Sequence, residues 1–273
     1  MMIQGEGLEH ELAEFRAAHP ARRLAHGGND WRYYAAGQGG DAVLLLAGAL
    51  GPAEFAFQQI RLLEPHCRVL APDYPPVPTL GALTSGLLAL LDTERIKTAH
   101  VVGGSFGGLV AQALVRQAPE RVATLVLAHT GAPDGRRRRA ANVVALLPAP
   151  LLRAALKANL GRTLAAADPF WRRLFAQAVG RLSRADILSR IRLHAEFSAE
   201  AGYRPDDLTA WPGRVLVIEA DDDPLFPPAA QQRLRALYPS AHVHQFRGTG
   251  HVAVILRPEE YSSVLTRFFG MTA

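Results

Sequence analysis

A single serine stands among four glycines in the stretch GGSFGG, residues 103–108. An apolar run precedes this stretch and a helical pattern follows it, so Ser105 falls at a strand-to-helix turn. The pattern G-x-S-x-G at such a turn holds the serine in a strained conformation that exposes its hydroxyl as a nucleophile. Glycine is needed at Gly103 and Gly107, where the turn leaves no room for a Cβ. We therefore predict that Ser105 is a nucleophile; the alternative is a glycine-rich turn with an incidental serine.

A serine hydroxyl reacts slowly unless a base takes its proton, and the base needs an acid to orient it. The segment VLVIEADDDPLFPP ends an expected strand with Asp221, Asp222 and Asp223. We predict Asp223 as the acid because it directly precedes PLFPP, and the other two remain alternatives. His251 follows the flexible stretch GTG near the end of the last expected strand, and we predict it as the base. Serine, acid and histidine follow each other in one of the chain orders known for such triads.

Acyl transfer also needs two donors for the negative charge that develops on the substrate oxygen. One donor would be the backbone N–H of Phe106, directly after the serine. The other would be the N–H of Ala49, in the loop LAGALG that follows the apolar run AVLLLAG. We therefore expect Ala49 and Phe106 to form an oxyanion hole.

The sequence does not fit the patterns of metal or cofactor sites. The letters GGSFGG cannot be aligned to the dinucleotide-binding pattern G-x-G-x-x-G, and the chain has no GK[ST] of a Walker loop. The single Cys67 excludes an internal disulfide and a cysteine-based metal cage. His242, His244 and His251 could be drawn as a metal set, but no carboxylate is placed to join the first two. We expect no metal and no organic cofactor.

The elements around these residues alternate between strand and helix. The first 20 residues predict a short helix, and a GGND turn within residues 21–40 predicts a hairpin. Apolar runs of strand length then alternate with helical patterns, which is typical of a doubly wound, mostly parallel sheet in an α/β protein. The expected strands are 42–48, 68–74, 98–103, 122–129, 214–220 and 242–248, and the expected helices are 52–64, 80–94, one from residue 105, 227–238 and 257–269.

The alternation breaks between residues 135 and 205, where only helical patterns occur. We predict a core of residues 1–134 and 206–273 with a helical cap of residues 135–205. Leu147 and Trp171 in this cap, and His129 at the end of a core strand, are possible substrate contacts. The cap residues could equally form the interior of the cap, and His129 could be structural.

Charge is spread unevenly along the 273 residues, whose net charge is +5. Residues 136–205 hold 14 basic residues and four acidic ones, and GRRRRA at 135–140 is expected to be a solvated run. The excess could attract an anionic substrate or an acidic membrane surface. Only Lys97 and Lys157 are lysines among 30 basic residues, so we favour a compositional bias toward arginine and expect no nucleic-acid partner.

The longest obvious apolar run has nine residues, too short to span a membrane, and the N-terminal stretch lacks the features of a signal peptide. We expect a cytoplasmic protein without stable membrane insertion.

Taken in order, LLLAGALG, VLAPDYP, VVGGSFGG, EADDDPLFP and GTGH resemble the motifs of the α/β-hydrolase superfamily. Within it, AEFAFQQIRLLEPHCRVLAPDYP and LLPAPLLRAAL look most similar to maspardin-like proteins. Two features depart from the superfamily: the oxyanion loop has Ala47-Gly48 in place of His-Gly, and YPPVPTL replaces a longer loop. The backbone donor survives the first change, and the second predicts a more open pocket.

The resemblance implies a serine hydrolase that cleaves an ester or related acyl bond of a small molecule through an acyl-enzyme. Two alternatives are a C–C bond hydrolase or lyase with the same triad, and a non-catalytic binding protein of the maspardin type. Some members of that group are thought to lack the catalytic histidine, so the presence of His251 favours an enzyme.

Overall fold

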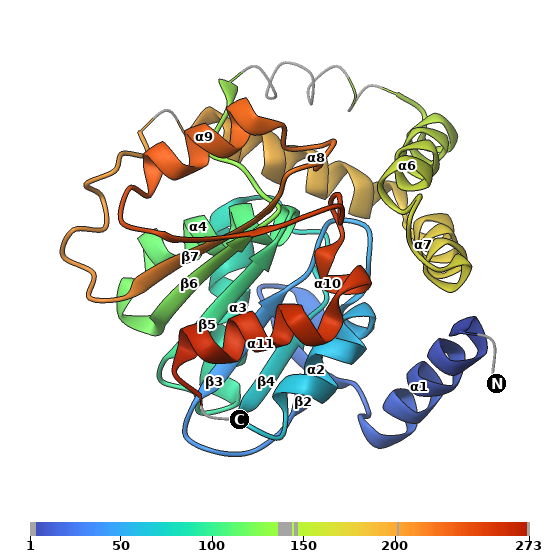
Figure 1. The fold of residues 1–273 in the computed structure, drawn as a ribbon, viewed down its shortest axis with the longest axis horizontal. Coiled ribbons are helices and arrows are strands. Elements are labelled where there is room, and N and C mark those ends of the chain that lie inside the picture. Colours follow the sequence, from blue (N-terminus) through green and yellow to red (C-terminus); the bar gives the residue numbers. More distant parts are fainter. Residues whose placement is uncertain (1–3, 136–143, 145–146, 201, 272–273) are drawn as a thin grey trace.

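The computed structural model describes residues 4–135, 144, 147–200 and 202–271. Its central feature is an eight-stranded sheet in the order β1-β2-β4-β3-β5-β6-β7-β8 (Figure 1). The hairpin strands β1 and β2 pair antiparallel, β2 runs antiparallel to β4, and the other neighbours are parallel. The strands are β1 Arg22–His26, β2 Asn29–Ala36, β3 Ala42–Leu46, β4 Arg68–Pro72, β5 Ala99–Gly104, β6 Val122–Ala128, β7 Arg214–Ala220 and β8 His242–Phe246. The prediction of a doubly wound, mostly parallel α/β sheet is confirmed.

The continuous apolar runs become central strands because helices cover both faces of the sheet. Successive side chains of a strand point to opposite faces, so Leu44 and Leu46 of β3 join one half of the core while Val43 and Leu45 join the other. All residues of β3 are buried. The edge strand β8 carries histidines and a glutamine and is largely exposed, which suits a strand with one unpaired side.

Helices pack on both faces of the sheet, and α11 crosses in front of it in Figure 1. Residues of α3, α4, α8 and α9 share one half of the core, and residues of α1, α2, α7 and α11 share the other. The helices are α1 Gln4–Ala18, α2 Phe57–Leu63, α3 Leu80–Thr93, α4 Phe106–Gln117, α6 Ala149–Thr163, α7 Pro169–Arg181, α8 Arg184–Ala199, α9 Pro228–Leu237, α10 Ala253–Leu256 and α11 Pro258–Phe269, with short 3₁₀ turns η1 Ala53–Ala56 and η2 Pro119–Arg121.

The segment expected to form a cap contributes α6, α7 and α8. Helices α6 and α7 pack against each other and lie together at the side of the sheet in Figure 1, where α7 also contacts α1. Helix α8 packs instead against α3 and α4, two of the helices that cover the sheet. The division into a core and a cap at residues 135 and 205 stays a prediction, and the arginine run at 136–139 lies outside the described residues.

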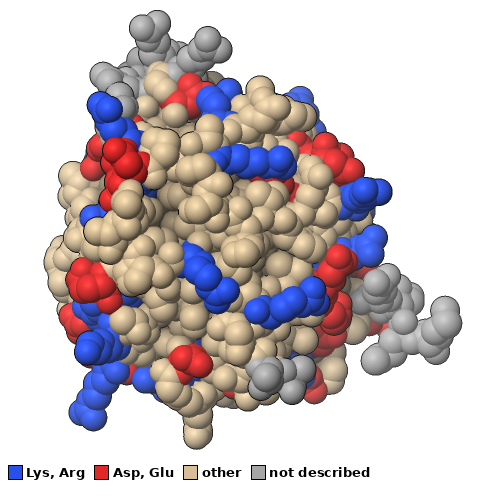
Figure 2. Space-filling model, turned by 60° about the vertical axis from the view of Figure 1, so that its left-hand side comes forward, with Lys and Arg blue, Asp and Glu red and all other residues tan. Residues whose placement is uncertain are grey.

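Surface charge and hydropathy give two further findings. On the face shown in Figure 2, Lys and Arg are interspersed with Asp and Glu and do not gather in one patch. None of the helices formed by the described residues combines the length and the apolar character that crossing a membrane requires.

Candidate active site

Four of the predicted residues follow the carboxyl ends of adjacent parallel strands. Ser105 comes directly after β5 and His129 directly after β6, and the register pairs the last residues of these two strands. Asp223 follows β7, and His251 follows β8. Because parallel strands end at the same edge of a sheet, the topology brings together residues as far apart in sequence as 105 and 251.

The backbone at Ser105 is strained, with φ 52° and ψ −114° between β5 and α4. Its N–H donates to the carbonyl of Ala128 at 2.9 Å, and its carbonyl accepts from Thr130 Oγ1 at 2.8 Å. A Cβ on Gly103 would lie 2.4 Å from the carbonyl oxygen of Gly107, and one on Gly107 would lie 2.0 Å from that of Leu46. The glycines flanking Ser105 are therefore required by close backbone approach, as the sequence pattern predicts.

Asp223 and His251 form a hydrogen-bonded pair. Nδ1 of His251 lies 2.9 Å from Oδ2 of Asp223 and 3.2 Å from Oδ1. The Asp223 side chain is 1% exposed, and Oδ1 also accepts the backbone N–H groups of Leu225 and Phe226. Burial alone would raise the pKa of Asp223, but hydrogen bonds from His129 and His251 outweigh it and hold that pKa well below its usual range. The ionised carboxylate can only accept, so Nδ1 of His251 carries the proton.

The other two aspartates of the DDD stretch hold the loop that carries His251. Oδ1 of Asp222 accepts the N–H of Gly250 at 2.8 Å, and Oδ1 of Asp221 accepts the N–H of Gly248 at 3.1 Å. Both glycines have positive φ, 66° at Gly248 and 54° at Gly250, which a residue with a side chain adopts only at a cost. The three neighbouring carboxylates thus have three different contacts, and Asp223 is the one that meets the imidazole of His251.

A second histidine shares the Asp223 carboxylate. Nδ1 of His129 lies 3.2 Å from Oδ2 of Asp223, and the rings of His129 and His251 meet edge to face. The His129 backbone has a positive φ of 47°, and burial lowers the pKa of its imidazole against the opposing effect of Asp223. His129 is therefore neutral and donates from Nδ1. Its Nε2 is buried and has no hydrogen-bond partner in the part of the chain that the structure describes.

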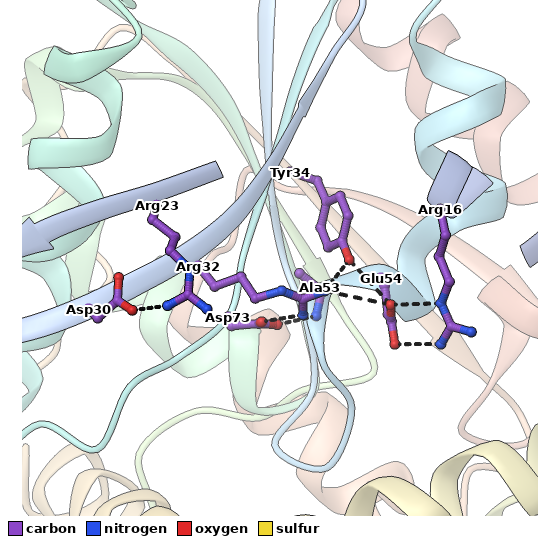
Figure 3. Close-up of polar contacts among 8 residues, drawn as sticks. All are labelled: Arg16, Arg23, Asp30, Arg32, Tyr34, Ala53, Glu54 and Asp73. Carbon is purple, nitrogen blue, oxygen red and sulfur yellow. Dashed lines mark hydrogen bonds and ion pairs between the residues drawn. The ribbon is translucent and has the colours of Figure 1, made fainter. Parts of the chain in front are cut away.

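The loop that carries Ala49 is fixed at both ends. The hydroxyl of Tyr74 donates to the carbonyl of Ala47 at 3.0 Å, and Oδ1 of Asp73 accepts the N–H of Ala53 at 2.6 Å. Asp73 is in turn held by Arg32 at 2.9 Å (Figure 3). The same figure shows Glu54, next to Ala53, between Tyr34 and Arg16. The sequence does not predict this network, because its members lie on four separate segments that only the fold brings together.

Two cavities meet at Ser105. The larger, of about 550 Å³, is lined by Phe106, Thr130, Arg190 and His194, among mostly apolar side chains. The smaller, of about 380 Å³, is lined by His129 and His251 among others. Ser105 and Ala49 line both.

Two predicted substrate contacts lie away from these cavities, since neither Leu147 nor Trp171 lines either one. Leu147 is 38% exposed, and Trp171 is 2% exposed and packs against Phe55, Phe57 and Phe175. Of the three residues His129, Leu147 and Trp171, His129 lines a cavity at Ser105.

Three of these residues could also be drawn as metal ligands. One atom each of His129, Asp223 and His251 lies within 4.8 Å of the others. Both imidazoles, however, direct Nδ1 to the same carboxylate oxygen at hydrogen-bond distance, which uses the protons that a metal would replace. The arrangement fits a carboxylate shared by two imidazoles.

A sequence profile described as "Alpha/beta hydrolase family" matches residues 24–264, and the chain belongs to this family. Among curated proteins, a putative carbamate hydrolase, RutD, of Caulobacter segnis is 29% identical over 250 residues, which cover 84% of this chain and 91% of that protein. Maspardin of Danio rerio is 26% identical over 259 residues, covering 90% and 81%. The maspardin resemblance is confirmed, although the Caulobacter sequence is more similar.

Two further comparisons extend this picture. The 2-hydroxymuconate semialdehyde hydrolase of Pseudomonas putida is 28% identical over 250 residues, covering 81% of each chain. A solved structure of a hydrolase from Pseudomonas aeruginosa PA01 superimposes with a TM-score of 0.78 at 23% identity, covering 92% of this chain and 98% of that one. The structural likeness supports the fold.

Proposed function

We propose that the protein is a serine hydrolase that cleaves an ester or a related acyl bond through an acyl-enzyme. The observation that carries this proposal is the hydrogen bond between the buried Asp223 and His251, whose imidazole lines the same cavity as the strained Ser105. A nucleophile held at a sharp turn, with a base oriented by an ionised carboxylate, is the arrangement that acyl transfer needs.

In the proposed reaction, Oγ of Ser105 attacks the substrate carbonyl while Nε2 of His251 takes the hydroxyl proton. The N–H groups of Ala49 and Phe106 stabilise the oxyanion, and the N–H of Phe106 is available because the first N–H groups of a helix have no partner within it. His251 then donates its proton to the leaving group. Water, activated by the same imidazole, adds to the acyl-enzyme and releases the acid. Asp223 keeps Nδ1 of His251 protonated throughout.

The relatives support hydrolysis without fixing the bond that is cleaved. The RutD relative suggests a carbamate as one possible acyl compound, and the P. putida relative suggests a C–C bond of a semialdehyde. The same three residues could serve in each case. Turnover of a diketone-type substrate without turnover of esters would favour C–C hydrolysis over the proposed function.

The test is labelling with a fluorophosphonate followed by peptide mass spectrometry. We expect the wild-type protein to be labelled at Ser105, and Ser105→Ala to remain folded, unlabelled and slower by about 10⁶ in turnover of 4-nitrophenyl esters of graded chain length. A label on another serine would refute the assignment of the nucleophile. A folded wild-type protein that neither reacts with the probe nor turns over any ester would favour the binding-protein alternative.

A further inference from the structure

Arg190, on α8, lines the larger cavity beside Ser105 with a side chain that is 15% exposed. Its Nη1 donates to the carbonyl of Asp186 at 3.1 Å, within the same helix. Its Nε is buried and finds no hydrogen-bond acceptor among the described residues. Burial lowers the pKa of Arg190, yet a guanidinium stays protonated in proteins. A charged side chain whose polar groups are only partly paired within the fold therefore lines the cavity.

The nearest carboxylate gives Arg190 only partial compensation. Oδ1 of Asp186 lies 3.9 Å from Nη1, at the outer limit of an ion pair. Its other oxygen accepts the backbone N–H and the hydroxyl of Ser183, at 2.8 and 2.6 Å, and so caps the start of α8. Among the described residues, no aspartate or glutamate lines this cavity.

Arg116 shows what a structural arginine looks like in the same protein. Its side chain is similarly buried, and one of its nitrogens also lacks a partner. Arg116 nevertheless donates to Asp207 at 3.0 Å and to the Tyr238 hydroxyl at 2.8 Å, and it stacks on the ring of Tyr203. Arg116 thus donates to a carboxylate and a hydroxyl within the fold. Arg190 is attracted by Asp186, Tyr74 and Asp73, but among the described residues it has no hydrogen bond to a carboxylate.

The position of the histidine sets the direction of a bound substrate. His251 lines the smaller cavity and Arg190 the larger, while Ser105 lines both. In the proposed reaction His251 must protonate the leaving group, so the leaving group occupies the side of the smaller cavity. The acyl chain then extends into the larger cavity, toward Arg190.

We propose that the larger cavity binds an acyl chain that ends in a carboxylate, with Arg190 as its anchor. This inference rests on the proposed hydrolase function and names its substrate class: a monoester, or a related monoacyl derivative, of a dicarboxylic acid. Water adds across the acyl bond, and the products are the dicarboxylate and the leaving alcohol. The apolar walls of the cavity accommodate the methylene chain, and the guanidinium supplies the charged hydrogen bonds.

The test compares mono-4-nitrophenyl esters of adipic, suberic and sebacic acid with the matching methyl 4-nitrophenyl diesters, which lack the charge. We expect the wild-type protein to prefer at least one monoester by its kcat/KM. In Arg190→Gln the ratio of kcat/KM between monoester and diester should fall roughly 30-fold or more, chiefly through KM. Arg190→Lys should retain part of the preference. Arg192→Gln removes the same charge from an exposed position two residues away and should leave the ratio unchanged.

A binding measurement separates this inference from the proposed function. Ser105→Ala is titrated calorimetrically with adipate, suberate and sebacate, with and without the additional Arg190→Gln substitution. Binding of one diacid that needs Arg190 supports the subsite even if no ester is turned over, a result that would overturn only the hydrolase function. Ester turnover with no preference for a carboxylate at any chain length, or diacid binding that survives Arg190→Gln, would overturn the subsite.

Discussion

Replacing Asp223 by asparagine changes the carboxylate at the one atom where two imidazoles meet. Oδ1 accepts the N–H groups of Leu225 and Phe226, whereas Oδ2 accepts Nδ1 of His129 and is the nearer oxygen to Nδ1 of His251, at 2.9 Å against 3.2 Å for Oδ1. The backbone donors cannot turn, so the amide oxygen stays at Oδ1 and the amide NH₂ replaces Oδ2. His251 must then accept at Nδ1 and carry its proton on Nε2, where it can no longer take one from Ser105.

This wrong tautomer should lower kcat by about 10⁴, equivalent to about 5.5 kcal/mol of transition-state stabilisation. The assay is steady-state turnover of the best 4-nitrophenyl ester, with circular dichroism to show that the variant is folded. Asp222→Asn is the matched control, because an amide oxygen can still accept the N–H of Gly250, and its kcat should change far less. Asp221→Asn should behave in the same way. A damaging Asp222→Asn beside a nearly active Asp223→Asn would refute the reasoning.

Two further predictions concern the oxyanion loop and the buried second histidine. Ala49→Pro removes a backbone donor and should lower kcat by about 10²–10³, whereas Ala49→Ser keeps the donor and should keep most of the activity. Near wild-type turnover by a folded Ala49→Pro protein would show that the second oxyanion donor lies elsewhere. Burial lowers the pKa of His129 in the folded protein. Below about pH 6.5 the unfolded chain therefore binds a proton at this residue that the folded protein does not bind, and the free energy of unfolding decreases as the pH falls through that value. In urea unfolding between pH 7.5 and 5, His129→Asn should flatten this dependence by up to about 1.4 kcal/mol per pH unit, and an unchanged slope would count against a buried neutral His129.

Much of the fold could be predicted because its signals are local. Each predicted strand of the parallel sheet lies within a residue or two of an observed one, since apolar runs of that length suit strands covered on both faces. The turn at Ser105 could be located because close backbone approach leaves glycine as the residue that fits. The role of these residues in catalysis stays a prediction.

The remaining features of the site depend on contacts between distant segments. The following PLFPP favours Asp223 within the stretch DDD but leaves Asp222 as an alternative, because the difference between them arises from their contacts with a loop near residue 250. Arg190 looks like any other arginine of a basic segment until its exposure and neighbours are known. For Trp171, a large apolar residue on a helix, the sequence predicts that the side chain is buried, as it is. The sequence does not predict which surface the side chain packs against.

The backbone strain at the site is concentrated at the ends of two neighbouring strands. Ser105 and His129 have positive φ without being glycine, and each such residue costs about 1–3 kcal/mol. The two ends support each other, because Ser105 donates its N–H to Ala128, the residue before His129, and Thr130, the residue after it, donates its hydroxyl to the Ser105 carbonyl. His129 in turn donates its own N–H to Ile218 on β7. Glycine would relieve the strain at either position, but it would remove the hydroxyl at one and the Asp223 donor at the other. Both positions therefore keep a residue with a side chain although its backbone is strained. The hydrogen bonds between the two strand ends stabilise these strained conformations.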